Sequence, residues 1–429
     1  GPPARAVAAP SRAPAPCVPL RGGLPHRMGE VMDSHAEEYG RRNAEEMGKP
    51  LAQAIGEINL PKRIFTYFAD NAERLLAPKV TEIAGASHSY TQLEPTGVTL
   101  AVEPWNVPAY QAMRAAAPTI MLGNTILMKP AGITVNSSLL FEEWFREAGF
   151  PEGVFQTSLL TSAQISRFIA DDRVGSVTFT GSDRVGSIIG KQAGEHIKPV
   201  VLELGGSDPF VVLDSADVTQ AATLAARVRL ANAGQICVSP KRVIVTDKVA
   251  DEFIATYAQI FASARVGDPF DTETTVGPMA SVSAAQDLQE LYQDAVDKGA
   301  TVVVPGGRQD GPGAYFTPAV ITDITPEMDV YSEEAFGPLG MIHRVADADA
   351  AIALANDSKY GLTGTVFGAD IEEATRVASA LDVGGVGINR YFGAPIEVPF
   401  GGTKASGVGR ELGDSGMDAY ANVKSYSIG

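Results

Sequence analysis

The sequence is poor in cysteine, with only Cys17 and Cys237 among 429 residues. Two cysteines cannot build a disulfide framework, so the composition favours a reducing compartment, and we expect the cytoplasm. The five histidines show no metal-ligand spacing. With so little cysteine, we expect neither a structural zinc site nor any other bound metal.

Long uninterrupted apolar runs and an excess of basic residues are also missing. The most apolar stretch, 107–128, is broken by Arg114 and Asn124 and contains two prolines, so we do not expect a membrane span. The net charge of −17 argues against a nucleic-acid partner. A composition of 45% hydrophobic and 20% charged residues is typical of a soluble globular protein, and the length predicts two or three domains.

Residues 1–26 contain seven prolines, six alanines and no acidic residue. Such a composition cannot build a packed element, so we expect a disordered tail. A targeting peptide is a weaker alternative, because the segment has arginine but little serine. The chain begins with Gly rather than Met, which is compatible with a missing natural start.

Short apolar strands alternate with helices from about residue 103 onward. The apolar segment 125–129 precedes a helical segment at 136–148, and 176–179 precedes another at 187–194. This alternation predicts parallel strands joined by helical crossovers in a doubly wound α/β sheet. A second α/β region follows without an obvious linker. The alternating segment 421–428 predicts an edge strand that pairs with another strand, for example in a second subunit.

Cys237 is the first candidate for catalysis and lies in the stretch 228–242, VRLANAGQICVSPKR. Gly234 breaks the helical pattern just before the thiol. On such a turn a substrate can reach the thiol, and backbone N–H groups can lower its pKa. The alternative is an inert buried cysteine, which is the commoner role of a lone cysteine.

Three further candidates stand at predicted strand ends or turns. Glu203 ends VVLE before a di-glycine, where partial burial would raise its pKa and suit a general base; a surface glutamate is the alternative. Lys129 ends a predicted strand, where open α/β sheets bind ligands, or it is a surface lysine. Asn106 follows Pro-Trp and can donate to a developing oxyanion, or it simply forms the turn.

The segment FTGS (179–182) and Gly186 lie between a predicted strand and a helix. Gly181 and Gly186 are five residues apart, which does not match the G-x-G-x-x-G fingerprint. A helix N-terminus with a glycine and the Ser182 hydroxyl still suits a phosphate. A plain strand-to-helix turn is the alternative.

In combination these motifs resemble the aldehyde dehydrogenase superfamily from about residue 27 to the C-terminus, and their wording is most similar to succinate-semialdehyde dehydrogenases. Glu203 and Cys237 stand 34 residues apart, as the family's base and nucleophile do. The motifs occur in the family's order: EMGKPLAQAIGEI (46–58), PWN (104–106), MKPA (128–131), FTGS (179–182), LELGGSDP (202–209), NAGQIC (232–237), EEAFGP (333–338) and PFGGTKASGVGRE (399–411).

The resemblance implies a fold of three parts. These are a Rossmann-like NAD(P)-binding domain (27–76 and 93–205), an α/β catalytic domain (206–404) and a small β oligomerisation arm (77–92 and 412–429). It also implies a homodimer or homotetramer.

The resemblance further implies oxidation of an aldehyde to the acid. The Cys237 thiolate attacks the aldehyde, and the Asn106 side chain with the Cys237 N–H holds the oxyanion. Hydride passes to the cofactor and leaves a thioester, which water activated by Glu203 hydrolyses. The implied cofactor-binding residues are Trp105, Lys129, Gly181, Ser182, Gly186, Leu204, Glu334 and Phe336.

Three departures from the family pattern affect these expectations. Gly132 stands where many members carry a ribose-binding glutamate, which removes repulsion against a 2′-phosphate, so NADP is expected alongside NAD. The usual N-terminal stretch before Met28 is absent or replaced by the Pro/Ala-rich tail, which would weaken cofactor binding or solubility. Ser239, rather than a second cysteine, lies near Cys237, so we do not expect a redox-switch disulfide.

The substrate expectation depends on arginines. Arg114 lies eight residues after Asn106, where the resemblance implies a ligand for the carboxylate of succinate semialdehyde. A second arginine of some members, six residues before the cysteine, is Ala231 here. Arg390, in the loop 389–395, supplies the missing charge or signals another aldehyde. The alternative for Arg114 is a surface ion pair.

Three other functions remain open from the sequence. The first is another aliphatic or aromatic aldehyde as substrate. The second is a CoA-acylating semialdehyde dehydrogenase, which Glu203 disfavours because such enzymes typically lack this base. The third is an inactive truncated chain with a structural or binding role, which the intact set of chemical residues disfavours.

Overall fold

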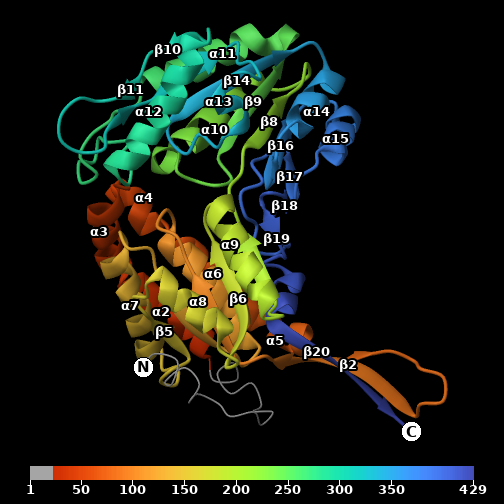
Figure 1. The fold of residues 1–429 in the computed structure, drawn as a ribbon. Helices are drawn as coiled ribbons and strands as arrows, with labels where there is room; N and C mark the ends of the chain where they lie inside the picture. The colour runs from red at the N-terminus through yellow and green to blue at the C-terminus, as the bar shows by residue number, and fades with distance from the viewer. Residues whose placement is uncertain (1–22) are drawn as a thin grey trace.

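The computed structural model describes residues 23–429 and has two α/β lobes (Figure 1). The first lobe is built on a six-stranded sheet of order β19-β7-β6-β3-β4-β5, in which only the edge strand β19 is antiparallel. Its strands are β3 (Val98–Val102), β4 (Thr125–Lys129), β5 (Phe155–Thr157), β6 (Val174–Thr180), β7 (Val200–Glu203) and β19 (Gly407–Val408).

The five parallel strands follow the Rossmann order, since β3 is central and the chain runs outward first through β4 and β5 and then through β6 and β7. The carboxyl ends of these strands therefore meet along one edge of the sheet. Lys129 ends β4, Thr180 ends β6 and Glu203 ends β7. The predicted doubly wound α/β architecture is confirmed, and this edge is where ligands bind in such sheets.

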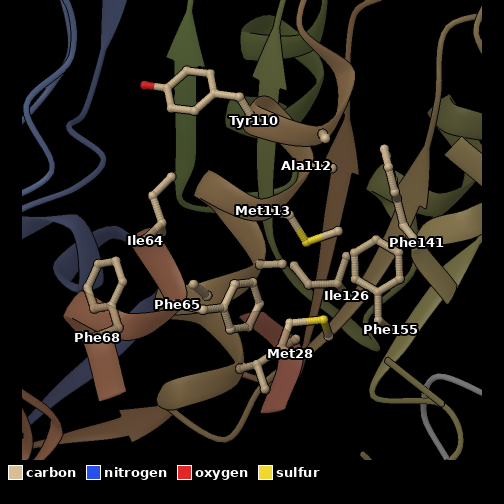
Figure 2. Close-up of a cluster of buried hydrophobic side chains, with 14 of the residues drawn as sticks. Met28, Ile64, Phe65, Phe68, Tyr110, Ala112, Met113, Ile126, Phe141 and Phe155 are labelled. Atoms are coloured by element: carbon tan, nitrogen blue, oxygen red, sulfur yellow. The ribbon is translucent and has the colours of Figure 1, made fainter. Parts of the chain in front are cut away.

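Helices cover the first sheet on both faces. They are α2 (Leu24–Ser34), α3 (Ala36–Met47), α4 (Leu51–Gly56), α5 (Asn59–Leu76), α6 (Pro108–Met121), α7 (Val135–Glu147), α8 (Ser162–Ala170) and α9 (Asp183–Glu195). Figure 2 shows the core between them, where Met28, Phe65, Met113, Phe141 and Phe155 come together from four helices and β5.

Helix α2 corrects one boundary of the predicted disordered tail. Residues 24–26 were assigned to that tail, but they form the first turn of α2, with Pro25 in the first turn, where its missing N–H costs nothing. Burial of Met28 and Met32 against the other helices stabilises the turn. The remainder of the predicted tail, 1–22, lies outside the described residues.

The second lobe is built on a seven-stranded sheet of order β10-β13-β14-β9-β8-β16-β17, parallel except for β10. Its strands are β8 (Asp208–Val212), β9 (Pro240–Thr246), β10 (Thr301–Val304), β13 (Ala319–Thr322), β14 (Leu339–Val345), β16 (Thr363–Phe367) and β17 (Gly385–Ile388). The main helices are α10 (Val218–Leu230), α11 (Asp247–Ala262), α12 (Val282–Asp297), α14 (Ala348–Asn356) and α15 (Ile371–Ala380).

A β-ribbon projects away from both lobes (Figure 1). It consists of β1 (Lys79–Val80), β2 (His88–Pro95) and β20 (Ala421–Ile428). β20 pairs with β2 along its whole length, and Tyr90 stacks on Tyr426 with ring centroids 4.6 Å apart. The predicted strand 421–428 is confirmed, although its partner here is β2 of the same chain. The division into three domains stays a prediction.

Among residues 23–429, no helix combines the length and the apolar character that crossing a bilayer requires.

Candidate active site

The loop before Cys237 has an unusual backbone. Helix α10 ends at Leu230, earlier than the sequence pattern predicts, and Asn232, Ala233 and Gly234 follow with φ of 51°, 52° and 73°. A Cβ on Gly234 would lie 2.3 Å from the carbonyl oxygen of Gly337, so the left-handed backbone and the close approach both require glycine. Consecutive left-handed residues are costly and are typical of functional loops.

Asn106 is tied to this loop by side-chain hydrogen bonds. Its Nδ2 donates to the Gln235 carbonyl at 2.9 Å, and the Asn232 Nδ2 donates to the Asn106 carbonyl at 2.9 Å. The Gln111 Nε2 donates to the Asn106 Oδ1 at 2.9 Å and so fixes the orientation of the amide. One N–H of the Asn106 amide is left over, which is what an oxyanion donor needs.

The pKa of the Cys237 thiol differs from the sequence expectation. Although Cys237 is partly exposed, burial among protein atoms raises its pKa to about 11, and Lys241 and Arg114 offset only part of this effect. The lowered thiol pKa that the sequence predicts is therefore not found. Lys241 is fully buried and donates to the carbonyls of Ile236 at 2.9 Å and of Cys237 at 2.7 Å. It thus holds a positive charge beneath the nucleophile turn.

Glu203 is the last residue of β7 and is 2% exposed. Within residues 23–429, neither of its carboxylate oxygens has a hydrogen-bond partner. Burial raises its pKa well above the usual range; Arg114 works against this shift, and Glu411 adds to it. A buried, unpartnered carboxyl with a raised pKa is suited to general-base chemistry.

Arg114 lies in the interior of the protein, whereas the sequence suggested a substrate ligand or a surface ion pair. Its side chain is 1% exposed, its Nε forms an ion pair with Glu411, and its Nη2 donates to Thr180 Oγ1 at 3.0 Å. The neighbouring Glu103 is buried without a partner, and burial raises its pKa to about 8. Arg114 is therefore neither a surface residue nor open to a substrate carboxylate, because Glu411, brought in by the C-terminal segment, occupies its guanidinium.

The N-terminus of α9 is prepared for an anion. Ser182 caps this 13-residue helix by accepting from the Val185 N–H at 3.4 Å. A Cβ on Gly186 would lie 2.3 Å from a methyl group of Leu204, and one on Gly181 would lie 2.4 Å from the ring of Phe179. Glycines therefore let the helix start pack closely against β7, with its N–H groups at the ligand edge of the sheet.

Lys129 is the last residue of β4, and Gly132 follows three residues later. Lys129 is half-buried, and burial lowers its pKa. A Cβ on Gly132 would meet no atom within 4 Å, so the space beside it is open. An amine next to open space, with no carboxylate, fits the 2′-phosphate of NADP better than a glutamate at this position would.

The other end of a bound dinucleotide would contact Glu334, Trp105 and Phe336. The Glu334 Oε1 accepts from the Gly206 N–H at 3.1 Å and pairs with Lys241 at 3.0 Å. The rings of Trp105 and Phe336 meet edge to face with centroids 5.8 Å apart. Together with the α9 N-terminus and Lys129, these groups form a donor and acceptor set that fits NAD(P).

A cavity of about 320 Å³ opens beside the nucleophile loop. Asn232 and Ile236 line it on the second-lobe side, and α4, α5 and α6 line it on the other. The sequence does not predict that α4 or α5 contributes to the site. The first-lobe lining residues include Lys49, Glu57, Leu60, Arg63, Val107 and Tyr110.

The loop 389–395 contributes a residue other than the one predicted. Arg390 is exposed, and it does not line the cavity. The adjacent Tyr391 instead donates through its hydroxyl to the Val238 carbonyl at 3.0 Å, directly after Cys237. The loop thus touches the nucleophile turn through its tyrosine.

Comparisons with known proteins agree with this geometry. The model of the aldehyde dehydrogenase family matches residues 4–426. A succinate-semialdehyde dehydrogenase [NADP(+)] of Deinococcus radiodurans is 44% identical over 404 residues, which cover 94% of this chain and 84% of that protein. Another of the same name, numbered 1, from Mycobacterium ulcerans, is 40% identical over 406 residues, covering 94% and 89%.

Among solved structures, the succinic semialdehyde dehydrogenase of Streptococcus pyogenes in complex with NADP+ superposes with a TM-score of 0.96 at 38% identity. The match covers 100% of this chain and 94% of that one. The chain therefore belongs to the aldehyde dehydrogenase family and is an NAD(P)-dependent oxidoreductase.

Proposed function

We propose that the chain oxidises succinate semialdehyde to succinate with NADP, using Cys237 as nucleophile and Glu203 as base. The observation that carries the proposal is that the two groups share one electrostatic environment. The buried Arg114 lowers the pKa of both, while Asn106 is hydrogen-bonded to the loop that presents the thiol.

Catalysis begins with the deprotonated Cys237 thiol attacking the aldehyde carbon. The oxyanion that forms accepts hydrogen bonds from the free N–H of the Asn106 amide and from the backbone N–H of Cys237. Gln111 keeps the amide nitrogen, rather than its oxygen, turned to the reacting atoms. When bound, the dinucleotide supplies the acceptor for the substrate's hydride.

Glu203 then takes a proton from the water that hydrolyses the thioester on Cys237. Its raised pKa makes it a stronger base than a solvated carboxylate, and its two unpartnered oxygens are free to bind that water. Proton transfer to Glu203 removes a buried charge, so the low polarity of its surroundings favours this step.

The substrate and the cofactor are proposed from the relatives and from Gly132. Two curated relatives and one solved structure carry succinate semialdehyde and NADP in their names. The open space at Gly132 beside Lys129 supports a 2′-phosphate. We also propose a cytoplasmic location, which the scarcity of cysteine supports.

Assembly into a homodimer or homotetramer belongs to the same proposal. The β-ribbon of β1, β2 and β20 stands free of the body and exposes Val80, Ile83, Val423 and Ile428. Apolar side chains on an exposed edge favour pairing with a second copy.

The test is reduction of NADP or NAD, followed by absorbance, with succinate semialdehyde, butanal, nonanal and benzaldehyde. We expect the highest kcat/KM for succinate semialdehyde with NADP and no requirement for CoA. A higher kcat/KM for nonanal or benzaldehyde would overturn the substrate. Turnover that depends on CoA, and that Glu203→Gln retains, would indicate the acylating reaction instead.

A further inference from the structure

We propose that Arg63, on α5, binds the carboxylate of the substrate and so determines specificity for carboxylated aldehydes. This inference rests on the proposed function, because it assumes a substrate with a carboxylate. It replaces Arg114 and Arg390, which the sequence suggested for this role.

The cavity beside the nucleophile loop is lined both by Arg63 and by the residue before Cys237. One wall is formed by Ile236, the residue before the nucleophile, and by Asn232. Arg63 lies in the opposite wall, which comes from the first lobe. A volume of about 320 Å³ is larger than a small aldehyde requires. A substrate whose aldehyde carbon lies at Cys237 therefore extends its other end toward the first-lobe wall.

The other cation of the cavity, Lys49, is already neutralised. Its Nζ lies 2.5 Å from the Glu57 Oε2, and both side chains are almost completely buried. The other oxygen of Glu57 accepts from the Tyr39 hydroxyl at 2.7 Å and from the Ala109 N–H at 2.9 Å. Glu57 thus binds the start of α6, and Lys49 balances its charge. This pair holds the wall together and has no charge left for a ligand.

Arg114 and Arg390 are not available for different reasons. Arg114 is enclosed and paired with Glu411, which is also buried. Arg390 is exposed outside the cavity lining. Among the residues described as lining the cavity, Arg63 is therefore the arginine whose guanidinium is accessible, with a side chain 59% exposed.

Glu397, the ion-pair partner of Arg63 in the described part of the chain, is bound weakly enough to exchange. Its Nη2 lies 3.4 Å from the Glu397 Oε1, and the Glu397 side chain is 60% exposed. Such solvent-exposed pairs contribute little, so a substrate carboxylate can take the place of Glu397 at small cost. A guanidinium also binds a carboxylate through two parallel hydrogen bonds, which a lysine does not.

The backbone that carries Arg63 is rigid. The next residues of α5 on the opposite face, Ile64, Phe65 and Phe68, are buried in the core of the first lobe, as Figure 2 shows. The backbone is thus already ordered, and binding a ligand costs only the rotamer freedom of the Arg63 side chain. Replacing an exposed side chain on this anchored helix leaves the fold intact.

The experiment compares Arg63→Met with Arg390→Met, a matched control on the loop that touches the nucleophile turn. KM and kcat are measured for succinate semialdehyde and for butanal, which lacks the carboxylate. We expect Arg63→Met to raise KM for succinate semialdehyde about threefold to tenfold, the range of a partly exposed charged pair, while kcat and the butanal constants change little. Arg63→Lys should recover part of the loss, and Glu397→Gln should lower KM for succinate semialdehyde.

The outcomes separate the two proposals. If the unaltered enzyme does not prefer succinate semialdehyde over butanal, the proposed function fails and the Arg63 inference fails with it. If the enzyme has this preference and Arg63→Met retains it, only the Arg63 inference fails. An equal rise in KM for both aldehydes would also overturn the inference, because it would indicate a change in cavity shape.

Discussion

The interior position of Arg114 makes a quantitative prediction for Arg114→Met. Arg114 and Glu411 are each about 1% exposed and form an ion pair. At pH 7 the neighbouring Glu103 is mostly neutral, because burial raises its pKa to about 8. The substitution therefore leaves the buried Glu411 carboxylate without its ion-pair partner and also removes the positive charge that acts on Glu203. Removing one partner of such a pair costs about 3–5 kcal/mol of unfolding free energy.

The assay is urea unfolding of Arg114→Met, Glu411→Gln and the double variant at one protein concentration. Each single variant leaves one charge buried alone, whereas the double variant removes both. We expect the double variant to lose less stability than the sum of the singles, with a coupling free energy of about 1–3 kcal/mol.

Two results would refute this reasoning. A loss below about 1 kcal/mol, or fully additive single variants, would mean that Arg114 and Glu411 are not a buried pair. A selective increase in KM for succinate semialdehyde, with butanal unaffected, would restore Arg114 as the substrate ligand that the sequence suggested.

Three further predictions concern the nucleophile and the cofactor. The rate of Cys237 alkylation by iodoacetamide in the cofactor-free enzyme should increase about tenfold per pH unit between pH 7 and 10, because burial raises the thiol pKa to about 11. Mass spectrometry of the Cys237 peptide measures this rate. A rate that levels off near pH 8 would contradict the raised pKa. Gly132→Glu should raise KM for NADP about tenfold more than KM for NAD, since a carboxylate would face the 2′-phosphate. The control variant Gly132→Gln should change the two KM values equally. Equal changes in Gly132→Glu would contradict a 2′-phosphate site beside Gly132. Gly234→Ala should lower the free energy of unfolding by at least about 1–2 kcal/mol in thermal unfolding and remove most of the activity. The new Cβ would collide with the Gly337 carbonyl, and the backbone φ of 73° is unfavourable for alanine. Wild-type stability and activity would show that the loop relaxes freely.

The positions that the sequence predicted correctly are local features of single strands. Glu203 and Lys129 stand at the carboxyl ends of strands, and this can be seen from short apolar runs that end in a charged residue. The strand 421–428 was predicted from its alternating pattern and is confirmed as β20. Such patterns depend on the period of one element and need no knowledge of its partners.

What the sequence did not predict depends on long-range packing. Arg114 meets Glu411 only because the C-terminal segment returns to the first sheet as β19. The two strands β8 and β16 were not predicted, since an Asp-Pro opens one and a glycine interrupts the other, and both features usually mark turns. The raised pKa of Cys237 likewise comes from burial by several elements of the fold, whereas a turn alone suggests a lowered pKa.

The most direct test of the account is to trap the covalent intermediate. Glu203→Gln, mixed with succinate semialdehyde and NADP, should release NADPH in a burst equal to the enzyme concentration and then turn over slowly. Peptide mass spectrometry should find one succinyl group attached to Cys237, because the thioester forms but is not hydrolysed. An unmodified Cys237 after the burst, or a succinyl group on another residue, would contradict the account.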